Sequence, residues 1–201
     1  MTPIVDGVLD DHPLARRLPP HLVEIEIAQP FAIGRYPITN AQYQLFVDDG
    51  GYTEKWRLCW TEDGWQWRES KNRIRPYDWG DRFKIPNQPQ VGVTWYAAIA
   101  YVCWLEETHS QRYRLPTEAV GEVAARHTDG RYYPWGEDRQ DGMTNSKEAG
   151  LERIAAVGIF PGDTAVCVAQ DMSGNVAEWC QTRRKNEQNE DYSQPYREDD
   201  G

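Results

Sequence analysis

The sequence predicts a fold of short strands and helices joined by much irregular backbone, and three observations support this. Residues 22–27 alternate apolar and acidic side chains, which is the period of a half-buried strand. The stretches that follow Thr39, Thr94 and Pro116 carry apolar residues at helical spacing. Thirteen prolines and sixteen glycines in 201 residues favour loops over long regular elements.

One domain is expected to span residues 21–182, because a chain of 201 residues can bury about two-thirds of its unfolded surface. Residues 1–20 are expected to precede it as a mobile lead-in. Beyond the first strand, residues 31–33 are expected to extend that strand or to pair with it. At the other end, residues 183–201 are almost wholly polar, which predicts a loop or a tail.

The first helix is expected to run from Thr39 to about Asp48. Thr39 and Gln42 have the spacing of a capping box, in which each side chain accepts a hydrogen bond from the other residue's backbone N–H. Gly50 and Gly51 then end the helix, because glycine is a poor helix former and favours turns.

Residues 52–90 are interpreted as a long, irregular insertion that is rich in tryptophan. Residues 60–67 are expected to form a hairpin, because the pair Asp63-Gly64 favours a tight turn. The aromatic rings have two interpretations: a satellite core beneath a loop, or a surface that binds an aromatic ligand. The tryptophans of this segment are Trp56, Trp60, Trp65, Trp67 and Trp79.

Two further helices are expected. Residues 95–108 leave few positions for solvent, so this helix should be nearly buried and should be capped by Thr94. Residues 116–126 form the next helix, which a Pro-Thr pair opens. Shorter extended or turn segments are expected at 132–136 and 157–161.

Charge and hydropathy exclude several classes of function. The net charge of −10 disfavours nucleic-acid binding, which needs lysine and arginine to displace counterions from phosphate. No stretch approaches the roughly 20 apolar residues of a membrane span, and no positively charged leader precedes an apolar run. A cytoplasmic protein with a protein or small-molecule partner is therefore expected, without nucleic acid or membrane as partners.

The cysteines have neither the spacing of a zinc site nor that of a redox pair. Four free thiols are expected in a reducing compartment, and a Cys167–Cys180 disulfide is the alternative for an exported protein. No catalytic residue is assigned, because His109 and His127 have no evident partner and no nucleophile motif is present. The cysteines are Cys59, Cys103, Cys167 and Cys180.

Five blocks of sequence occur in the order found in one known family. They begin at Arg35, Pro89, Arg114, Tyr133 and Asp171, and they read RYPITNAQY, PQVGVTWYAA, RLPTEA, YPWG and DMSGNVAEW. From about residue 31 to residue 179, the chain resembles the formylglycine-generating enzyme-like domain, also called the sulfatase-modifying factor domain. The resemblance implies an α+β, C-type-lectin-like fold with much irregular structure.

The chain departs from this family in three ways. The usual Glu-Trp-Glu after Thr-Glu-Ala is Val120-Gly121-Glu122 here, and a usual tryptophan in the last block is Ala177. The two missing indoles predict cavities, unless the tryptophan-rich insertion fills them. The family's closing Gly-Gly-Ser-Trp and Gly-Phe-Arg segments do not occur, so the fold is expected to be incomplete at its C-terminus.

Calcium is the metal that the turn from Asp171 to Glu178 favours. Calcium takes six to eight oxygen ligands from carboxylates and carbonyls, and these two residues place carboxylates at the ends of a glycine-containing turn. Gly174 and Val176 offer carbonyls between them, and the resemblance points to the same four ligands. The alternative is a metal-free turn held by hydrogen bonds from the backbone to the carboxylates.

Other metals of the family are not expected here. Copper would need the family's redox cysteine pair, which Cys167 and Cys180 do not match. A second calcium site, which would use Asn145 and Ser146, lacks the full length of its completing loop. The family's ergothioneine-type oxidases take iron from a separate histidine-rich helical domain, which scattered histidines do not rebuild. The histidines of this chain are His12, His21, His109 and His127.

The leading interpretation is a non-catalytic module of this fold that binds a ligand or a protein, by analogy of fold. One subtype is the constant scaffold of the variable proteins of diversity-generating retroelements, which display a hypervariable C-terminal surface. The alternative is a fragment of a cysteine-dependent, sulfatase-modifying oxidase whose catalytic segment is absent. A third interpretation is a structurally incomplete family member, whose unpaired edges would make it prone to aggregation.

Overall fold

The computed structural model describes residue 27 and residues 30–129 and 131–182. In that part of the chain, four α-helices and three 3₁₀ helices are joined by long irregular segments, and strand pairing is limited to isolated bridges. The α-helices are α1 (Asn40–Asp48), α2 (Glu62–Ser70), α3 (Trp95–His109) and α4 (Glu118–Arg126), and the 3₁₀ helices are η2 (Glu54–Cys59), η3 (Asp81–Phe83) and η4 (Lys147–Ala149).

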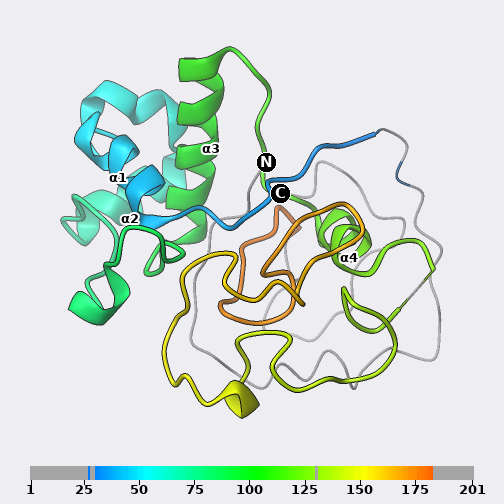
Figure 1. Cartoon of the computed structure of the whole chain (residues 1–201). Helices are drawn as coiled ribbons and strands as arrows, with labels where there is room; N and C mark the ends of the chain where they lie inside the picture. Colours follow the sequence, from blue (N-terminus) through cyan, green and yellow to red (C-terminus); the bar gives the residue numbers. More distant parts are fainter. Residues whose placement is uncertain (1–26, 28–29, 130, 183–201) are drawn as a thin grey trace, which may run out of the picture.

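Helices α1, α2 and α3 gather on one side of the molecule, whereas the other side is largely irregular and carries α4 (Figure 1). Helices α1, α2 and η2 all contact α3, while α4 lies beside the long loops that follow residue 131. The extended segments expected at 31–33 and 157–161 form no strand here. Of the expected α+β class, the described residues therefore show the helices and the irregular loops, with bridges such as Thr39–Pro89 and Thr164–Gln170.

The three expected helices are confirmed as α1, α3 and α4. At α1, the Gln42 N–H donates to the Thr39 hydroxyl at 3.3 Å, and the Thr39 N–H donates to the Gln42 side chain at 2.9 Å. Thr94 and Thr117 cap α3 and α4, and each hydroxyl accepts from a backbone N–H three residues later. These caps fix the helix starts, because the first N–H groups of a helix have no partner within it.

The hairpin expected over residues 60–67 is wrong, because residues from Glu62 onward form α2. Thr61 has extended backbone, and its hydroxyl accepts from the Gly64 N–H at 3.1 Å as a helix cap. Glu62 and Asp63 stabilise the first turn, since their charges lie at the positive end of the helix. A Cβ at Gly64 would lie 2.7 Å from Tyr96 Cβ, so glycine also permits the close approach of α3.

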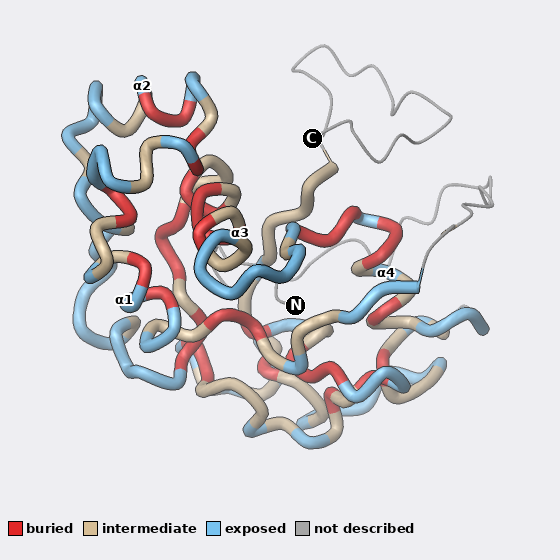
Figure 2. The backbone as a smooth tube through the Cα atoms, turned by 90° about the horizontal axis from the view of Figure 1, so that it is seen from above, coloured by how far each residue is buried: buried red, intermediate tan, exposed pale blue. Residues whose placement is uncertain are grey.

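The core is aromatic and lies between α1 and α3. Figure 2 shows buried residues in these two helices, and also in α2, α4 and several loops. Tyr43 and Phe46 are fully buried on the face of α1 that the apolar spacing predicts. The rings of Tyr43 and Tyr101 stack with centroids 4.9 Å apart, and Phe46 meets Tyr101 edge-on at 5.7 Å. Both arrangements are favourable for aromatic pairs, so the two helices are joined mainly by rings.

The tryptophan-rich segment contributes to this core. Trp60 and Trp65 are buried, and Trp60 Nε1 donates to the Gly51 carbonyl at 2.8 Å. A buried indole needs a partner for its N–H, and this hydrogen bond supplies it. The two rings therefore belong to the main core rather than to a satellite beneath a loop, whereas Trp79 is 57% exposed.

Cys59 and Cys103 form a disulfide that joins η2 to α3, with 5.3 Å between their Cα atoms. The expectation of four free thiols is therefore wrong. The alternative is wrong as well, because Cys167 and Cys180 both remain free. Disulfides are typical of oxidising compartments, so this bond gives no support to the expected cytoplasmic location. That location stays a prediction.

The positions of the two missing family tryptophans leave no buried cavity. A Cβ added at Gly121 would meet no atom within 4 Å, and Ala177 is exposed. Both positions face open space, so the expected repacking by residues 52–90 is not needed.

Replacing Gly121 with alanine is expected to raise the free energy of unfolding by about 1 kcal/mol, because alanine is the better helix former. Gly121 lies inside α4 and its backbone is not left-handed, so a methyl group is tolerated. Urea denaturation measures the change. Gly142→Ala is the matched control. A Cβ at Gly142 also faces open space, but the φ of +79° is unfavourable for alanine, so this variant should have a lower free energy of unfolding. Destabilisation by Gly121→Ala would contradict the placement of residue 121 at an open position inside α4.

No helix in the described part of the chain is long and apolar enough to cross a membrane. The expected lead-in at 1–20, the tail at 183–201 and the strand at 22–27, apart from Ile27, lie outside the described residues. The domain limits of 21–182 therefore stay a prediction.

Candidate functional site

The turn from Asp171 to Glu178 repeatedly enters the left-handed region of backbone conformation. The φ angle is +59° at Asp171, +115° at Gly174 and +63° at Asn175. Positive φ is uncommon for residues other than glycine and costs energy, so the surroundings must impose this shape. The segment that the sequence assigns to calcium is thus a rigidly specified turn.

Only glycine fits at position 174, for two separate reasons. Its φ of +115° is disfavoured for any residue with a Cβ. A Cβ there would also lie 2.7 Å from Thr144 Oγ1 and 2.9 Å from the Asn145 carbonyl oxygen. The Thr144 hydroxyl donates to the Ser173 carbonyl. The residues just before η4 are therefore packed directly against the turn.

Two buried asparagines connect the turn to these residues. Asn145 Nδ2 donates to Asn175 Oδ1 at 2.9 Å, and the Asn175 N–H donates to the Asn145 carbonyl at 3.0 Å. Asn175 Oδ1 also accepts from the Ala155 N–H at 2.8 Å. Ser146, the other residue of the family's second calcium site, donates its hydroxyl to Glu148 instead. In this structure Asn145 therefore holds the turn from Asp171 to Glu178 in place.

Three carboxylates lie close enough at this turn to influence one another. The sequence identifies Asp171 and Glu178, and it misses Asp163. Asp163 is fully buried, and its Oδ2 accepts from the Ser173 N–H at 3.1 Å. Its Oδ1 has no hydrogen-bond partner among the described residues. No spacing rule links Asp163 to the turn, because the contact arises only when the loop between them folds back.

Burial raises the pKa of all three groups, and repulsion between the carboxylates adds to the effect at Asp163 and Glu178. Burial, together with the Asp171 charge, raises the pKa of Asp163 to about 7. Burial also raises the pKa of Asp171, although the Gly158 N–H donates to it at 2.7 Å and opposes the effect. Burial and then the charges of Asp171 and Asp163 raise the pKa of Glu178 well above its usual range. Such a group of carboxylates is stabilised either by protons or by a cation.

The two carbonyls expected as ligands lie in the same turn. The Gly174 carbonyl accepts from the Val176 N–H at 2.8 Å, which leaves it a second lone pair. In the described part of the chain, no three His, Cys, Asp or Glu side chains converge closely enough to hold a metal ion by themselves. A cation here would need carbonyl oxygens as well as carboxylates, a donor set that calcium accepts.

The chain beyond the turn is held between the starts of two helices. Trp179 Nε1 donates to the Val93 carbonyl at 2.9 Å, and Trp95 Nε1 donates to the Cys180 carbonyl at 3.0 Å. At the start of α4, a backbone N–H donates to the Thr182 hydroxyl at 3.0 Å. The acidic turn is thereby fixed to both α3 and α4.

The histidines and free cysteines provide no evident nucleophile or base in the described residues. His109 and His127 lie at the ends of different helices. Cys167 is exposed, whereas burial and then two nearby glutamates raise the pKa of the Cys180 thiol to about 11. A thiol with a raised pKa is a poor nucleophile at neutral pH. These residues therefore fit neither a copper-binding cysteine pair nor a histidine iron site.

Comparison with known proteins places these features in a family. The model of the sulfatase-modifying factor enzyme 1-like domain matches residues 6–198. The chain is 34% identical over 194 residues to the hercynine oxygenase of Mycolicibacterium thermoresistibile, covering 88% of this chain and 41% of that protein. For the hercynine oxygenase of Mycobacterium tuberculosis, the identity is 35% over 87% of this chain and 42% of that protein. The inactive C-alpha-formylglycine-generating enzyme 2 of Mus musculus is 31% identical over 75% of this chain and 58% of its own length.

These relatives overturn the expectation of a non-catalytic binding module. The two hercynine oxygenases are enzymes by name, and they match across almost nine-tenths of this chain. The interpretation as the scaffold of a retroelement variable protein is a form of that expectation and is wrong for the same reason. The alternative, an oxidase, agrees better with the relatives. The chain spans about two-fifths of the length of these oxygenases.

The matched region is wider than the resemblance read from the sequence blocks, which runs from about residue 31 to residue 179. It covers nearly the whole chain, including segments outside the described residues. The family has a C-type-lectin-like fold, in keeping with the loop-rich structure seen here. The chain belongs to the sulfatase-modifying factor enzyme 1-like domain family.

Proposed function

We propose that this chain is the formylglycine-generating enzyme-like domain of an oxygenase that acts on hercynine or a closely related small molecule. The observation that carries the proposal is the identity of 33% to 35% with three hercynine oxygenases, across 87% to 88% of this chain. A sulfatase-modifying oxidase has less support, because Cys59 and Cys103 are joined and the pKa of Cys180 is raised.

The chemistry of such an oxygenase would need iron, by analogy with the ergothioneine-type oxidases of this family. The described residues do not fit an iron site, since their two histidines lie on different helices and no group of three metal-ligating side chains converges. Iron would have to be held by residues outside the described part of this chain or by another polypeptide. The part of the protein described here would contribute a rigid scaffold beside that centre.

Oxygen uptake tests this proposal. The protein is isolated from its own cells with every polypeptide that co-purifies, and it is supplied with iron(II), cysteine as a thiol reductant, and hercynine. We expect uptake that depends on hercynine, measured with an oxygen electrode, and much slower uptake when histidine replaces hercynine. Aldehyde formation on a cysteine peptide, without hercynine-dependent uptake, would contradict the proposal and favour the sulfatase-modifying oxidase.

We also propose that the turn from Asp171 to Glu178 binds calcium. The ligands would be the carboxylates of these two residues and the carbonyls of Gly174 and Val176. Support comes from the raised pKa values of the carboxylates, because a cation would offset their repulsion. Asp163 would add negative charge beside the ion. The competing interpretation, a metal-free turn, is supported by the hydrogen bond from a backbone N–H to Asp171.

Millimolar calcium is expected to raise the melting temperature of the protein by several degrees, because a ligand that binds only the folded state stabilises it. Glu178→Ala should abolish the shift, since it removes one of two carboxylate ligands. Differential scanning fluorimetry measures both, with magnesium as the ion control. Glu107→Ala, which removes an exposed carboxylate from α3, is the matched variant and should keep the shift. An unchanged melting temperature in the parent would rule out the calcium site.

A further inference from the structure

Residues 71–87, termed the exposed segment, follow α2 and expose an unusual share of apolar side chains. Each of these residues is exposed or half-buried. The segment nevertheless carries four of the eleven large apolar side chains that are exposed in the described part of the chain. Single exposed apolar residues are common, but their concentration in one segment is typical of an interaction surface. The four are Ile74, Tyr77, Trp79 and Ile85.

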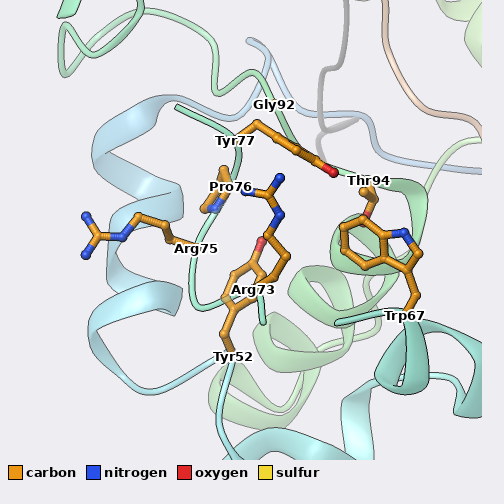
Figure 3. A pocket seen from close by; sticks show the side chains of 8 residues that line it. All are labelled: Tyr52, Trp67, Arg73, Arg75, Pro76, Tyr77, Gly92 and Thr94. Atoms are coloured by element: carbon orange, nitrogen blue, oxygen red, sulfur yellow. The ribbon is translucent and has the colours of Figure 1, made fainter. Parts of the chain in front are cut away.

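The aromatic side chains of this surface lie next to one another. The rings of Trp67, at the end of α2, and Tyr77 have centroids 6.4 Å apart. The Tyr77 carbonyl oxygen and Trp79 Nε1 both lie at Gly92, where a Cβ would come within 2.6 Å and 2.9 Å of them. Arg73 supports the Tyr77 ring, with its guanidinium carbon 3.3 Å from the ring centroid (Figure 3). Tryptophan and tyrosine are among the residues that most often dominate the binding energy of protein interfaces.

Hydrogen bonds fix the exposed segment to the rest of the fold. The Tyr77 N–H donates to the Gly92 carbonyl at 2.8 Å, just before α3. From the start of α1, Asn40 Nδ2 donates to the Phe83 carbonyl at 2.8 Å and to the Ile85 carbonyl at 2.9 Å. The apolar side chains are therefore held in place before any partner arrives. A surface that is ordered in advance loses little conformational entropy on binding.

The exposed segment is basic, although the whole chain carries a net charge of −10. It contains five cationic and two acidic side chains. Both acidic side chains, Asp78 and Asp81, contact Lys84, at 2.8 Å and 3.2 Å. Arg75 is exposed and points away from the side chains around it (Figure 3). A complementary partner surface is therefore acidic, with apolar side chains that cover the exposed rings.

A different polypeptide fits this surface better than a second copy of this chain does. In a symmetric dimer the same patch meets itself, so the basic segments of the two copies would repel each other. Nucleic acids and anionic membranes suit it less well, because the net charge of −10 opposes their approach.

We propose that Arg75, Tyr77 and Trp79 form the centre of a docking surface for an acidic segment of another polypeptide. Apolar side chains of the partner cover the two rings, and its carboxylates face Arg75. This inference does not depend on the proposed oxygenase activity or on the calcium site.

Zero-length cross-linking of the protein isolated from its own cells, with every polypeptide that co-purifies, tests this surface. A carbodiimide joins a lysine amine to a carboxylate in contact with it, so it reports an acidic neighbour directly. We expect Lys71, which is exposed at the start of the segment, to be joined to an aspartate or glutamate of a different polypeptide. Mass spectrometry of tryptic peptides identifies the two linked residues. Lys147, an exposed lysine in η4, is the matched control and should not be joined to that polypeptide.

Two replacements, introduced in the same cells, separate docking from chance proximity. Trp79→Ala and Arg75→Glu should each lower the yield of the Lys71 cross-link by roughly tenfold or more, as expected for loss of an interface hot spot. Two matched variants should leave the yield unchanged. Tyr132→Ala removes a ring that is 50% exposed outside the segment. Arg112→Glu reverses an exposed charge beyond the far end of α3, about 20 Å from the start of that helix.

The proposal is overturned if Lys71 is joined to no other polypeptide, or only to a second copy of this chain. It is also overturned if the two matched variants lower the yield as much as Trp79→Ala and Arg75→Glu do. Sedimentation of the protein with phosphatidylserine vesicles, in the absence of such a cross-link, would assign the surface to a membrane instead. If Trp79→Ala does not fold, as judged by circular dichroism, the comparison of Arg75→Glu with Arg112→Glu decides.

Discussion

Reducing the Cys59–Cys103 bond is expected to lower the free energy of unfolding by about 4 kcal/mol, from the loop-closure entropy of a 44-residue separation. The effect is large because the bond closes a loop that contains α2 and most of the tryptophan-rich segment. Cys59 is buried beside Trp60 and Trp65, so the bond also holds η2 against the aromatic core. Reduction removes no atoms from that core, which separates the effect of the crosslink from that of a cavity.

Guanidinium denaturation with and without a reducing agent measures this contribution. The double variant Cys59→Ala/Cys103→Ala should be less stable than the oxidised parent and should not respond to the reducing agent. Cys167→Ser removes an exposed free thiol and should respond as the parent does. If the parent unfolds at the same denaturant concentration in both conditions, the two cysteines are not joined in the native state.

The second large effect is expected at Asp163. In the presence of a calcium chelator, the free energy of unfolding should fall as the pH rises from about 4 to about 7. The cause is that burial raises the pKa of Asp163 from 3.8 to about 7. Between these values the folded protein holds a proton that the unfolded chain has released, so a rise in pH favours unfolding. At 1.36 kcal/mol per pKa unit, the full contribution is about 4 kcal/mol.

Asp163→Asn is expected to remove the part of that slope that Asp163 contributes and to be more stable than the parent at pH 8, while the raised pKa values of Asp171 and Glu178 keep a slope of the same sign. The amide keeps an oxygen that can accept from the Ser173 N–H, and it carries no charge to repel Asp171 and Glu178. Thermal denaturation over a series of pH values gives the measurement. Asp141→Asn, at an exposed position, should follow the parent. A profile for Asp163→Asn that runs parallel to that of the parent would show that this carboxyl is not protonated in the fold.

Elements set by local interactions could be predicted from the sequence. Thr39, Thr94 and Thr117 each begin a helix, because a cap depends only on residues three positions apart. The pair Asp63-Gly64 misled the prediction of a hairpin, since the same residues also fit the first turn of a helix that Thr61 caps. Local signals thus gave the helix starts, and failed where two local structures share one signal.

Contacts between distant segments could not be predicted in this way. The Cys59–Cys103 bond needs two Cα atoms 5.3 Å apart, and a sequence separation of 44 gives no information about that distance. Asp163 joins the acidic turn only through the fold of its loop, so the sequence identified two of the three interacting carboxylates. The four predicted calcium ligands lie in one turn with several positive φ angles. Local sequence could predict this turn, but not the distant residue Asp163 that packs against it.

Mass spectrometry under isotopically labelled dioxygen tests whether this domain belongs to an oxygenase. The protein isolated from its own cells is incubated with iron(II), cysteine and hercynine. Labelled oxygen is expected to appear in a product derived from hercynine, because the chain is 34% to 35% identical to two hercynine oxygenases. Unchanged hercynine in the presence of the folded protein, or a product without label, would contradict it.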